Sequence, residues 1–403
     1  MSLWRNSACV SLGLFFNLGA KVEKIIVMTT AAVIGTGFIG TVHIEAIRRM
    51  GIPVKGVLAG SDSSTGVAQQ SLKVPHAYKN LSEISTDSDV TIVHVTSPNA
   101  LHFTQVSELL RAGKHVICEK PLALTANEGK ELLSLAQSRN LVHALCFNTR
   151  FYPMVHEARA LVQSGAIGIP RYVNGSYHQD WLLLNTDWNW RLEEDKAGGL
   201  RAIADIGSHL IDQISFVSGL EVESVLADLH TIVPERKKPT GPVQTFTVDT
   251  SSSRENVQMK SDDAAGVLIR YRNGARGTLS ISQVSAGRKN NLGWEVSGTT
   301  SALAYDSTEP EKLWMGHRGK PNEISLKDPT SISADAAKNA FYPGGHIEGF
   351  GETFRALFER VYSDISRNER KVDYPNFVDG VTSLKITEAI AKSSKTQSWV
   401  KVD

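Results

Sequence analysis

A glycine-rich turn close to the start of the chain sets the strongest limit on its fold. Residues 31–34 are a short apolar run, Gly35-Thr36-Gly37-Phe38-Ile39-Gly40 has the pattern G-x-G-x-x-G, and the stretch to Met50 can form an amphipathic helix. Strand, glycine loop and helix in that order are the context in which this pattern binds a dinucleotide. Gly35 permits a tight turn, Gly37 lets the backbone approach a pyrophosphate, and Gly40 lets helix and strand pack closely.

The first turn of that helix, which begins with Phe38 and Ile39, offers unpaired N–H groups and a partial positive charge to the phosphates. An ordinary glycine-rich turn between a strand and a helix is the alternative. The strand before the pattern and the helix after it favour the dinucleotide site.

The end of the second expected strand, over 54–59, bears on which dinucleotide is bound. An acid there bonds the ribose 2′-hydroxyl and opposes a 2′-phosphate. Asp62 lies just beyond that position, Gly60 and Ser61 are small and neutral, and no arginine stands nearby to pair with a phosphate. The sequence therefore leaves NAD and NADP open, with a slight lean to NAD.

Strands and helices alternate through the first part of the chain. The strands are expected over 90–95, 115–118 and 141–147, and the helices over 101–112 and 126–139. Residues 90–95 are a continuous apolar and β-branched run, as a strand buried on both faces should be. This alternation is typical of an α/β fold with a doubly wound parallel sheet. We expect this Rossmann domain to occupy residues 29–150.

Polar residues follow the carboxyl ends of these strands, where ligands bind in open α/β sheets. They are Ser97, Asn99, Glu119 and Lys120. Lys120 precedes Pro121, which holds the residue before it in an extended conformation and aims the ammonium into the crevice. A lysine beside a nicotinamide can hold an alcohol oxygen and stabilise developing alkoxide charge. A solvated lysine at a strand end is the alternative.

The pattern changes after about Phe151. A helix is expected over 153–164 and another over 204–217, with strands over 171–177, 267–271, 277–282 and 291–297. Asn273-Gly274 is a strong hairpin signal. These segments predict a C-terminal α+β domain, residues 151–403, built on an open, mostly antiparallel sheet with helices on one side.

A loop and two closing helices are expected in the rest of this domain. Residues 240–262 are polar and rich in serine and threonine, which predicts a long surface loop. Helices over 346–363 and 376–393 close the chain, and the last of them can pack back on the first domain.

Asp205 and His209 lie four residues apart on the helix expected over 204–217, so both side chains face the same way. Histidine has the pKa nearest neutrality and suits general acid–base work. A carboxylate one turn away can orient a substrate or favour the imidazolium. A helix-capping aspartate and a buried structural histidine are the alternative.

Composition excludes several classes of function. The chain has 43 basic and 42 acidic side chains and a net charge of +1, which argues against a dedicated binder of nucleic acid or anionic membrane. Cys9, Cys118 and Cys146 are unclustered. This predicts reduced thiols in a cytoplasmic protein, with no disulfide framework and no metal site.

Residues 1–28 contain Arg5 and an apolar stretch too short to span a bilayer. We expect them to form an extension outside the fold. A secretory signal is the alternative.

Five stretches form a specific combination. They are A-V-I-G-T-G-F-I-G, S-P-N-A-L-H from Ser97, G-K-H-V-I-C-E-K-P from Gly113, C-F-N-T-R-F from Cys146 and G-G-L-R-A-I-A-D-I-G-S-H-L-I-D from Gly198. In these the chain resembles the glucose-fructose oxidoreductase / inositol dehydrogenase (Gfo/Idh/MocA) family of nicotinamide-dependent sugar dehydrogenases. The resemblance runs from about Thr29 to the C-terminus, strongly as far as Gly219. The missing acid at the end of the second strand is a departure that bears on cofactor preference.

The resemblance implies roles for individual residues. Lys120 would contact the substrate hydroxyl and the nicotinamide ribose, His209 would accept the hydroxyl proton, and Asp205 would bind substrate and support His209. The implied substrate-binding residues are Lys120, Asn148, Arg150, Asp205 and His209. The implied cofactor-binding residues are Gly35, Gly37, Phe38, Ile39, Gly40, Asp62, Ser97, Asn99, His102, Glu119, Lys120, Trp190 and Arg191, the last two forming a Trp-Arg pair near the nicotinamide.

The implied activity is hydride transfer between NAD or NADP and a hydroxyl of a monosaccharide, anhydrosugar or inositol, by a homodimer or homotetramer. Trp181, Trp188 and Trp190 can stack on a sugar ring, with core packing as the alternative. Two other functions stay open: cleavage of glycosides through transient oxidation by tightly bound NAD, and non-catalytic sugar sensing. Sensors of this fold tend to lose the lysine or the histidine, and this chain keeps both.

Overall fold

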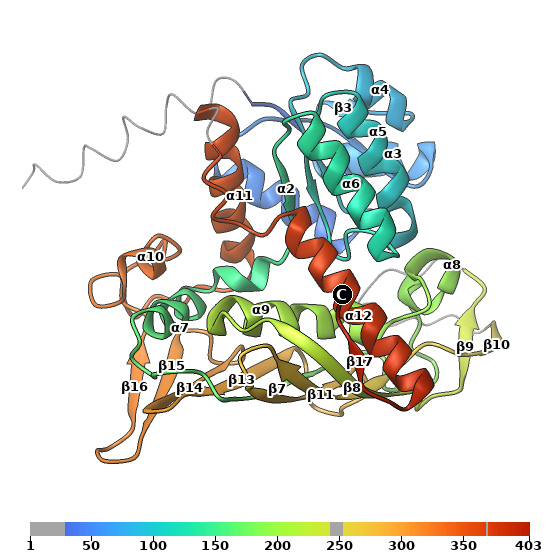
Figure 1. Ribbon diagram of the computed structural model, residues 1–403. Helices are drawn as coiled ribbons and strands as arrows, with labels where there is room; N and C mark the ends of the chain where they lie inside the picture. The colour runs from blue at the N-terminus through green and yellow to red at the C-terminus, as the bar shows by residue number, and fades with distance from the viewer. Residues whose placement is uncertain (1–28, 242–252, 368–369) are drawn as a thin grey trace, which may run out of the picture.

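The computed structural model describes residues 29–241, 253–367 and 370–403, so the extension expected over 1–28 lies outside the described residues. The first part of the chain forms a six-stranded parallel sheet with the order β3-β2-β1-β4-β5-β6 (Figure 1). The strands are β1 (Ala31–Ile34), β2 (Val54–Leu58), β3 (His76–Ala77), β4 (Ile92–Val95), β5 (His115–Cys118) and β6 (His143–Leu145). The predicted doubly wound parallel sheet is confirmed.

Helices cover both faces of this sheet because its strands are apolar on both sides. The helices of this part are α2 (Phe38–Arg49), α3 (Asp62–Ser71), α4 (Leu81–Thr86), α5 (His102–Arg111) and α6 (Ala126–Ser138). Val33 of β1 lies in the same core as Ile47 of α2, whereas its neighbour Ile34 lies in the core that holds Leu109 of α5. Successive side chains of a strand point to opposite faces, so each strand contributes to both cores.

The strand order reverses between β1 and β4, which are neighbours although β2 follows β1 in the chain. Ligands of doubly wound sheets bind at such a switch point, outside the carboxyl ends of the strands. Here the glycine turn after β1, Thr96 after β4 and Glu119 after β5 meet at that edge.

The second part is a nine-stranded sheet with the order β16-β15-β14-β13-β7-β12-β11-β8-β17. The strands are β7 (Tyr172–His178), β8 (Val222–His230), β11 (Ala264–Tyr271), β12 (Arg276–Ser282), β13 (Asn291–Ser297), β14 (Ser301–Asp306), β15 (Lys312–His317), β16 (Glu323–Leu326) and β17 (Val400–Lys401). Only β7 and β12 pair in parallel within this described sheet. The open, mostly antiparallel sheet is confirmed, and β11 and β12 form the predicted hairpin around Asn273-Gly274.

The prediction of a long surface loop over residues 240–262 is wrong in part. Residues Arg254–Gln258 form strand β10, which pairs with β9 (Glu235–Pro239) in a separate antiparallel ribbon. Strand formation depends on cross-strand partners more than on local composition, so a polar stretch gives little sign of it. Residues 242–252 lie outside the described part of the chain.

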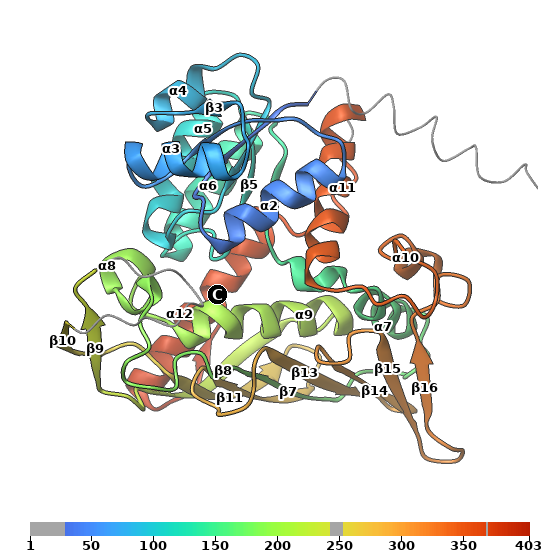
Figure 2. The ribbon, with the colours of Figure 1, turned by 180° about the vertical axis from the view of Figure 1, so that it is seen from behind.

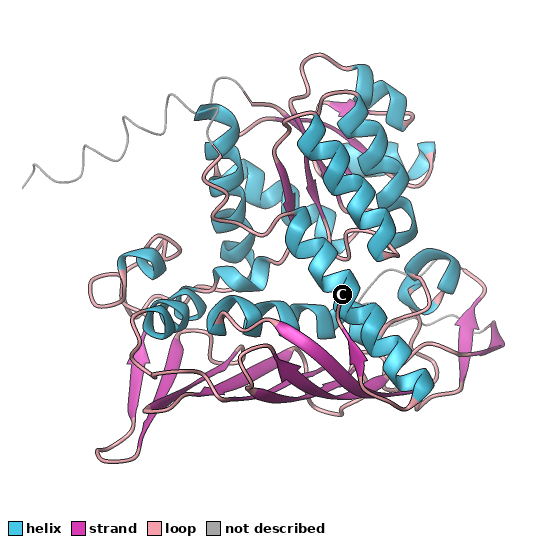
Figure 3. Ribbon diagram, viewed as in Figure 1, coloured by secondary structure: helices cyan, strands magenta, loops and turns pink. Residues whose placement is uncertain are grey.

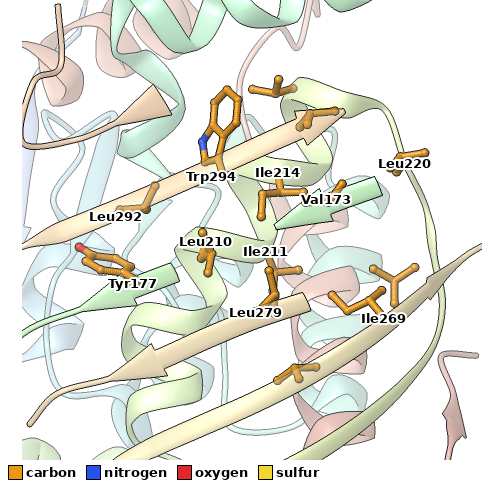
Figure 4. Close-up of a cluster of buried hydrophobic side chains, with 14 of the residues drawn as sticks. Val173, Tyr177, Leu210, Ile211, Ile214, Leu220, Ile269, Leu279, Leu292 and Trp294 are labelled. Atoms are coloured by element: carbon orange, nitrogen blue, oxygen red, sulfur yellow. The ribbon is translucent and has the colours of Figure 1, made fainter. Parts of the chain in front are cut away.

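Helices α7 (Pro153–Gln163), α9 (Ser208–Ser218) and α12 (Phe377–Thr396) lie on the face of the nine-stranded sheet that is turned toward the first part (Figures 2 and 3). Figure 4 shows Leu210 and Ile214 of α9 among sheet side chains such as Leu279. Burial of one such side chain contributes about 1.5–3 kcal/mol. The short helices α8 (Glu194–Ala197) and α10 (Ala334–Ala337) lie at the periphery.

The C-terminal helices join the two parts. Helix α11 (Phe350–Arg367) packs on α2, and α12 packs on both α6 and β8. Asn376 and Asp379 form a capping box that begins α12. The Phe377 N–H donates to Nδ1 of His143 at 3.2 Å, which fixes the start of α12 against the last parallel strand.

We expect His143 to make stability sensitive to acid. Burial, followed by the charge of Arg370, lowers the pKa of His143 to about 4. The unfolded chain therefore binds this proton more readily than the folded protein, and the free energy of unfolding should fall as pH drops from about 6.5 toward 4. In His143→Gln the amide oxygen can still accept the Phe377 N–H, but the group no longer titrates.

Urea unfolding followed by tryptophan fluorescence between pH 7 and pH 4.5 measures this effect. His143→Gln should reduce the slope of stability against pH by up to one proton, about 1.4 kcal/mol per pH unit. Substitution of the exposed His230 by Gln is the matched control. Equal slopes for wild type and His143→Gln would contradict the assignment.

Candidate active site

A cavity of about 330 Å³ lies between the two parts of the molecule. Its volume is at the lower end of the range for small-molecule sites. Ten of the predicted site residues line it: Gly37, Phe38, Ile39, Glu119, Lys120, Asn148, Trp190, Arg191, Asp205 and His209. Seven do not: Gly35, Gly40, Asp62, Ser97, Asn99, His102 and Arg150.

Lys120 and Asp205 meet across this cavity. The Lys120 Nζ donates to Oδ1 of Asp205 at 2.8 Å and to its backbone carbonyl at 2.7 Å. Lys120 follows β5 of the first part, and Asp205 precedes α9 of the second. The ion pair therefore exists only when the two parts are correctly placed against each other.

The segment that carries Asp205 differs from the plain helix expected over 204–217. Residues Ile203–Gly207 form a π-helical turn, and α9 begins after it. Both carboxylate oxygens of Asp262 accept backbone N–H groups here, from Arg201 at 2.7 Å and Ile203 at 2.8 Å. Such wide turns are rare and often lie at functional sites. Asp205 and His209 still face the same cavity.

The Asp205 carboxylate is held by three donors. Besides Lys120, the Nε of Arg191 donates to Oδ1 at 3.1 Å, and Nε2 of Gln283 donates to Oδ2 at 2.9 Å. Burial acts to raise the pKa of Asp205, but the charges of Arg191 and Lys120 outweigh it and hold that pKa well below its usual value. The carboxylate is therefore ionised and fixed in orientation.

A buried network supports the far side of Asp205. Gln283 accepts from Arg201 at 3.1 Å, Arg201 pairs with Asp263, and Arg236 of β9 donates to the same Asp263 carboxylate at 2.8 Å. Arg236 also donates to two carbonyls of the aromatic loop, residues 181–191. Only Arg201 lies in one of the marked sequence stretches; no motif marks Gln283, Asp263 or Arg236, because they come together with it only when β9, β11 and β12 assemble.

His209 is 8% exposed, and its Nδ1 has no hydrogen-bond partner among the described residues. Burial, followed by the nearby charge of Lys120, lowers the pKa of His209 to about 3, while the carboxylates of Glu119 and Asp205 act in the opposite direction. The imidazole is therefore neutral near pH 7 and has a lone pair with which to accept a proton.

Glu119 contributes a second carboxylate to the cavity wall. It accepts from Nε2 of His43 at 3.1 Å and from the Lys120 N–H at 3.2 Å. Burial acts to raise the pKa of Glu119, but the His43 hydrogen bond and the Lys120 charge leave it lowered. His43 contacts His94 and His94 contacts Tyr362, each at 2.9 Å. This buried chain ties α2, β4, β5 and α11 together.

The glycine turn fits a dinucleotide. Gly35 has φ +89°, and a Cβ there would lie 2.5 Å from the Thr96 backbone. A Cβ on Gly40 would lie 2.0 Å from the Gly35 carbonyl oxygen, whereas a Cβ on Gly37 would meet nothing within 4 Å. Gly37 caps α2 without a side-chain hydrogen bond. The helix N-terminus therefore opens onto free space, as pyrophosphate binding requires.

Four predicted cofactor residues with side chains lie away from the cavity, and three of them have other hydrogen-bond partners. Asp62 is the first residue of α3, and the Asn99 amide donates to the Ala197 carbonyl at 3.1 Å. The Ser97 hydroxyl bonds Gln105, and the His102 ring bridges the carbonyls of Ser97 and Pro121. His102 thus fixes the loop after β4 to the loop that carries Lys120.

Arg150, which the resemblance implied as a substrate-binding residue, does not line the cavity. Its guanidinium pairs with Asp212 and Asp379, whereas Asn148 lines the cavity and donates to Thr353 at 2.8 Å. Residues Asn148–Phe151 form a 3₁₀ turn, with about three residues per turn, so side chains two positions apart diverge.

The aromatic loop, residues 181–191, brings two of its three tryptophans to the cavity. Trp181 and Trp190 line it, whereas Trp188 lies under the Lys238 ammonium, 5.5 Å from its ring centre. Further polar residues of the lining, which the sequence patterns did not indicate, include Tyr177, Gln179, Gln213 and Asn290.

Two family models match the chain. "Oxidoreductase family, NAD-binding Rossmann fold" matches residues 29–146, and "GFO/IDH/MocA C-terminal domain" matches residues 155–304. The chain belongs to the Gfo/Idh/MocA oxidoreductase family. The predicted recognition is confirmed.

Individual members of the Gfo/Idh/MocA family are similar over almost the whole chain. Levoglucosan dehydrogenase of Pseudarthrobacter phenanthrenivorans is 29% identical over 92% of this chain and 97% of that protein. Glucose-6-phosphate 3-dehydrogenase of Bacillus subtilis is 25% identical over 92% of this chain and 98% of that protein. A structure of levoglucosan dehydrogenase with NADH and L-sorbose has a TM-score of 0.83 at 27% identity, covering 93% of this chain and 99% of that one.

These relatives agree with a NAD-binding Rossmann domain in a sugar or polyol oxidoreductase of this family. In the part of the chain that the structure describes, every helix is too short or too polar to cross a membrane.

We expect the glycine turn to separate cofactor binding from stability. In Gly37→Val the side chain would occupy the open space over the α2 N-terminus and lower affinity for NAD or NADP at least tenfold, about 1.4 kcal/mol, with little change in stability. Gly40→Ala should instead destabilise the fold by about 1–3 kcal/mol, because its Cβ meets backbone.

Nucleotide titration by calorimetry and thermal unfolding measure the two effects. Gly66→Ala, at an open helical position in α3, is the control and should be neutral or stabilising. Unchanged nucleotide affinity in Gly37→Val would contradict the site.

Proposed function

We propose that this protein is a NAD(P)-dependent dehydrogenase that oxidises a secondary hydroxyl of an uncharged sugar or polyol, or catalyses the reverse reduction. The observation that carries the proposal is the meeting of Lys120, Asp205 and His209 in one cavity beside an open α2 N-terminus. This reaction needs a cation to stabilise the alkoxide, a neutral base to accept the hydroxyl proton and a site that binds the dinucleotide.

The chain's own residues divide the work. The neutral imidazole of His209 takes the hydroxyl proton, which converts it to imidazolium; Glu119 and Asp205 offset that positive charge. The Lys120 ammonium stays on the substrate oxygen and stabilises its developing negative charge. Oδ1 of Asp205 accepts hydrogen bonds from both Lys120 and Arg191 and so holds the two cations in position. A bound nicotinamide would supply the hydride acceptor.

The cofactor would be held by the residues of the crevice edge. Gly37, Phe38 and Ile39 would bind the pyrophosphate through the α2 N-terminus, and Glu119 and Lys120 lie where the nicotinamide half would enter. We propose NAD over NADP, supported by NADH in the structure of a relative and by the absence of a basic partner beside Ser61 and Asp62 in the sequence.

The charges of the lining are largely paired among themselves. Lys120 and Arg191 share Asp205, Glu119 bonds His43, and Lys289 pairs with Asp180. An uncharged ligand leaves these pairs intact, whereas an anionic sugar needs an unpaired cation. The flat rings of Trp181 and Trp190 suit the apolar face of a sugar. This supports a monosaccharide, anhydrosugar or inositol as substrate.

We also propose that the dinucleotide domain covers 29–150 and the substrate domain 151–403. The end of β6 at Leu145 and the start of α7 at Pro153 support this boundary. A cytoplasmic homo-oligomer fits the buried free thiols of Cys118 and Cys146 and the open face of the nine-stranded sheet.

The test is reduction of NAD and NADP, separately, by purified protein with a panel of monosaccharides, anhydrosugars, inositols and glucose 6-phosphate. We expect turnover with at least one uncharged member. Lys120→Met and His209→Gln should each lower kcat at least 100-fold, in the range for loss of one acid–base or charge-stabilising group. His209→Gln should keep its nucleotide affinity within a few-fold, because His209 is not among the residues expected to hold the cofactor.

Lys130→Met, on the exposed side of α6, is the matched control and should keep full activity. Nucleotide binding without turnover across the panel would contradict the dehydrogenase proposal. A panel of glycosides would then separate glycoside cleavage from sugar sensing.

A further inference from the structure

Asn290, an exposed residue directly before β13, lines the same cavity as Lys120 and His209 and belongs to none of the motifs that mark the site. Its side-chain oxygen accepts two hydrogen bonds, from the Tyr177 hydroxyl at 2.7 Å and from Nε2 of Gln179 at 2.8 Å. Tyr177 and Gln179 are 6% and 8% exposed, so these donors belong to the wall itself.

A tryptophan fixes the direction of these bonds. The indole Nε1 of Trp181 donates to Oε1 of Gln179 at 2.7 Å. An indole N–H can only donate, so the end of the Gln179 amide that faces Trp181 must be the oxygen. The NH2 end of Gln179 therefore faces Asn290, and the atom of Asn290 that meets it must be the acceptor oxygen.

This direction determines what Asn290 offers to the cavity. With Oδ1 occupied by Tyr177 and Gln179, the NH2 group is the part of the side chain left for a ligand, and it makes no hydrogen bond to the described residues. The backbone is also fixed, since the Ser307 hydroxyl donates to the Asn290 carbonyl at 3.0 Å. Ser307 itself lines the cavity.

We propose that Asn290 is a substrate-binding residue whose NH2 group donates to an oxygen of the sugar that need only accept, such as a pyranose ring oxygen or the bridging ether of an anhydrosugar. The proposal rests on the proposed sugar dehydrogenase function and adds a specificity contact to it. Gln179 and Trp181 act as positioning residues, because they set the direction of the Asn290 amide without offering this donor themselves.

The chemistry distinguishes this contact from ordinary polarity. An amide NH2 can bond either an ether oxygen or a hydroxyl oxygen, whereas a carboxylate can bond only the hydroxyl, as acceptor. A carboxylate opposite an ether oxygen in the complex offers it no donor, so the ether oxygen loses the hydrogen bond that the asparagine would give it. Changing the donor to an acceptor should therefore penalise ether-containing substrates selectively.

The experiment compares wild type with Asn290→Asp on the best ether-containing substrate of the panel, with levoglucosan as the first probe and an inositol as the all-hydroxyl comparison. One carboxylate oxygen of the aspartate still accepts from Tyr177 and Gln179, so the wall is kept. We expect KM for the ether-containing substrate to rise about tenfold or more, with kcat within about threefold. The KM for any inositol turned over should rise less.

A second variant is designed to reverse the orientation of the Asn290 side-chain amide without substituting Asn290 itself. In Gln179→Glu, one oxygen still accepts from Trp181 and the other repels the Asn290 oxygen, so the asparagine amide should turn its NH2 group toward residue 179. The same selective rise in KM is expected. Asn127→Asp, an exposed site on α6, is the matched control and should leave all constants unchanged.

Each outcome of these measurements either supports or overturns the assignment of Asn290. A KM for the ether-containing substrate within about twofold of wild type in Asn290→Asp would overturn the inference, even though the dehydrogenase function would stand. An equal rise in KM for all substrates would also overturn it, because it would show only loss of packing. Absence of any sugar turnover by the wild type would remove the proposed function, and this inference with it.

Discussion

The ion pair between Lys120 and Asp205 is the interaction on which the rest of the site depends. Its two halves come from different parts of the molecule, the loop after β5 and the turn before α9, 85 residues apart in the chain, and both are largely buried. Leaving one charge of such a pair without its partner costs about 3–5 kcal/mol. In this structure the Asp205 carboxylate accepts from three donors, Lys120, Arg191 and Gln283. Gln283 is held in turn by a buried network of Arg201, Asp263 and Arg236.

Burial and then the nearby Lys120 favour the neutral ring of His209. In the proposed mechanism, the carboxylates of Glu119 and Asp205 would stabilise the imidazolium that forms when His209 takes a substrate proton. Glu119 is held by His43, and His43 belongs to α2, the helix whose N-terminus faces the expected pyrophosphate. The proposed catalytic residues and the proposed dinucleotide site are thus parts of one hydrogen-bonded framework, on which α11 and α12 pack from the C-terminus.

The sequence predicted the local parts of this framework well. A glycine turn between an apolar strand and a helix, Lys120 before a proline, and Asp205 four residues from His209 are patterns over a few residues, and each lies at the cavity. It also predicted both sheets and the hairpin at Asn273-Gly274.

Prediction was poorer where position depends on pairing between distant segments. Strand β10 needs β9 as a partner. Gln283 reaches Asp205, and Asn290 reaches the cavity, only because β12 and β13 flank β7. The π-helical turn at Ile203–Gly207 is stabilised by Asp262, which lies 59 residues from Ile203 in the chain. The 3₁₀ turn at Asn148–Phe151 directs Arg150 away from the cavity, and no local pattern marks that turn.

The most direct test of the account is the fate of the substrate hydrogen. The account predicts that a substrate deuterated at the reacting carbon passes its deuterium to C4 of the nicotinamide, so that mass spectrometry finds one deuterium in the reduced cofactor, with none in the product and none taken from D2O. Reduced cofactor without that deuterium, or product formed with deuterium exchanged into it from solvent, would contradict hydride transfer at the Lys120–Asp205–His209 site.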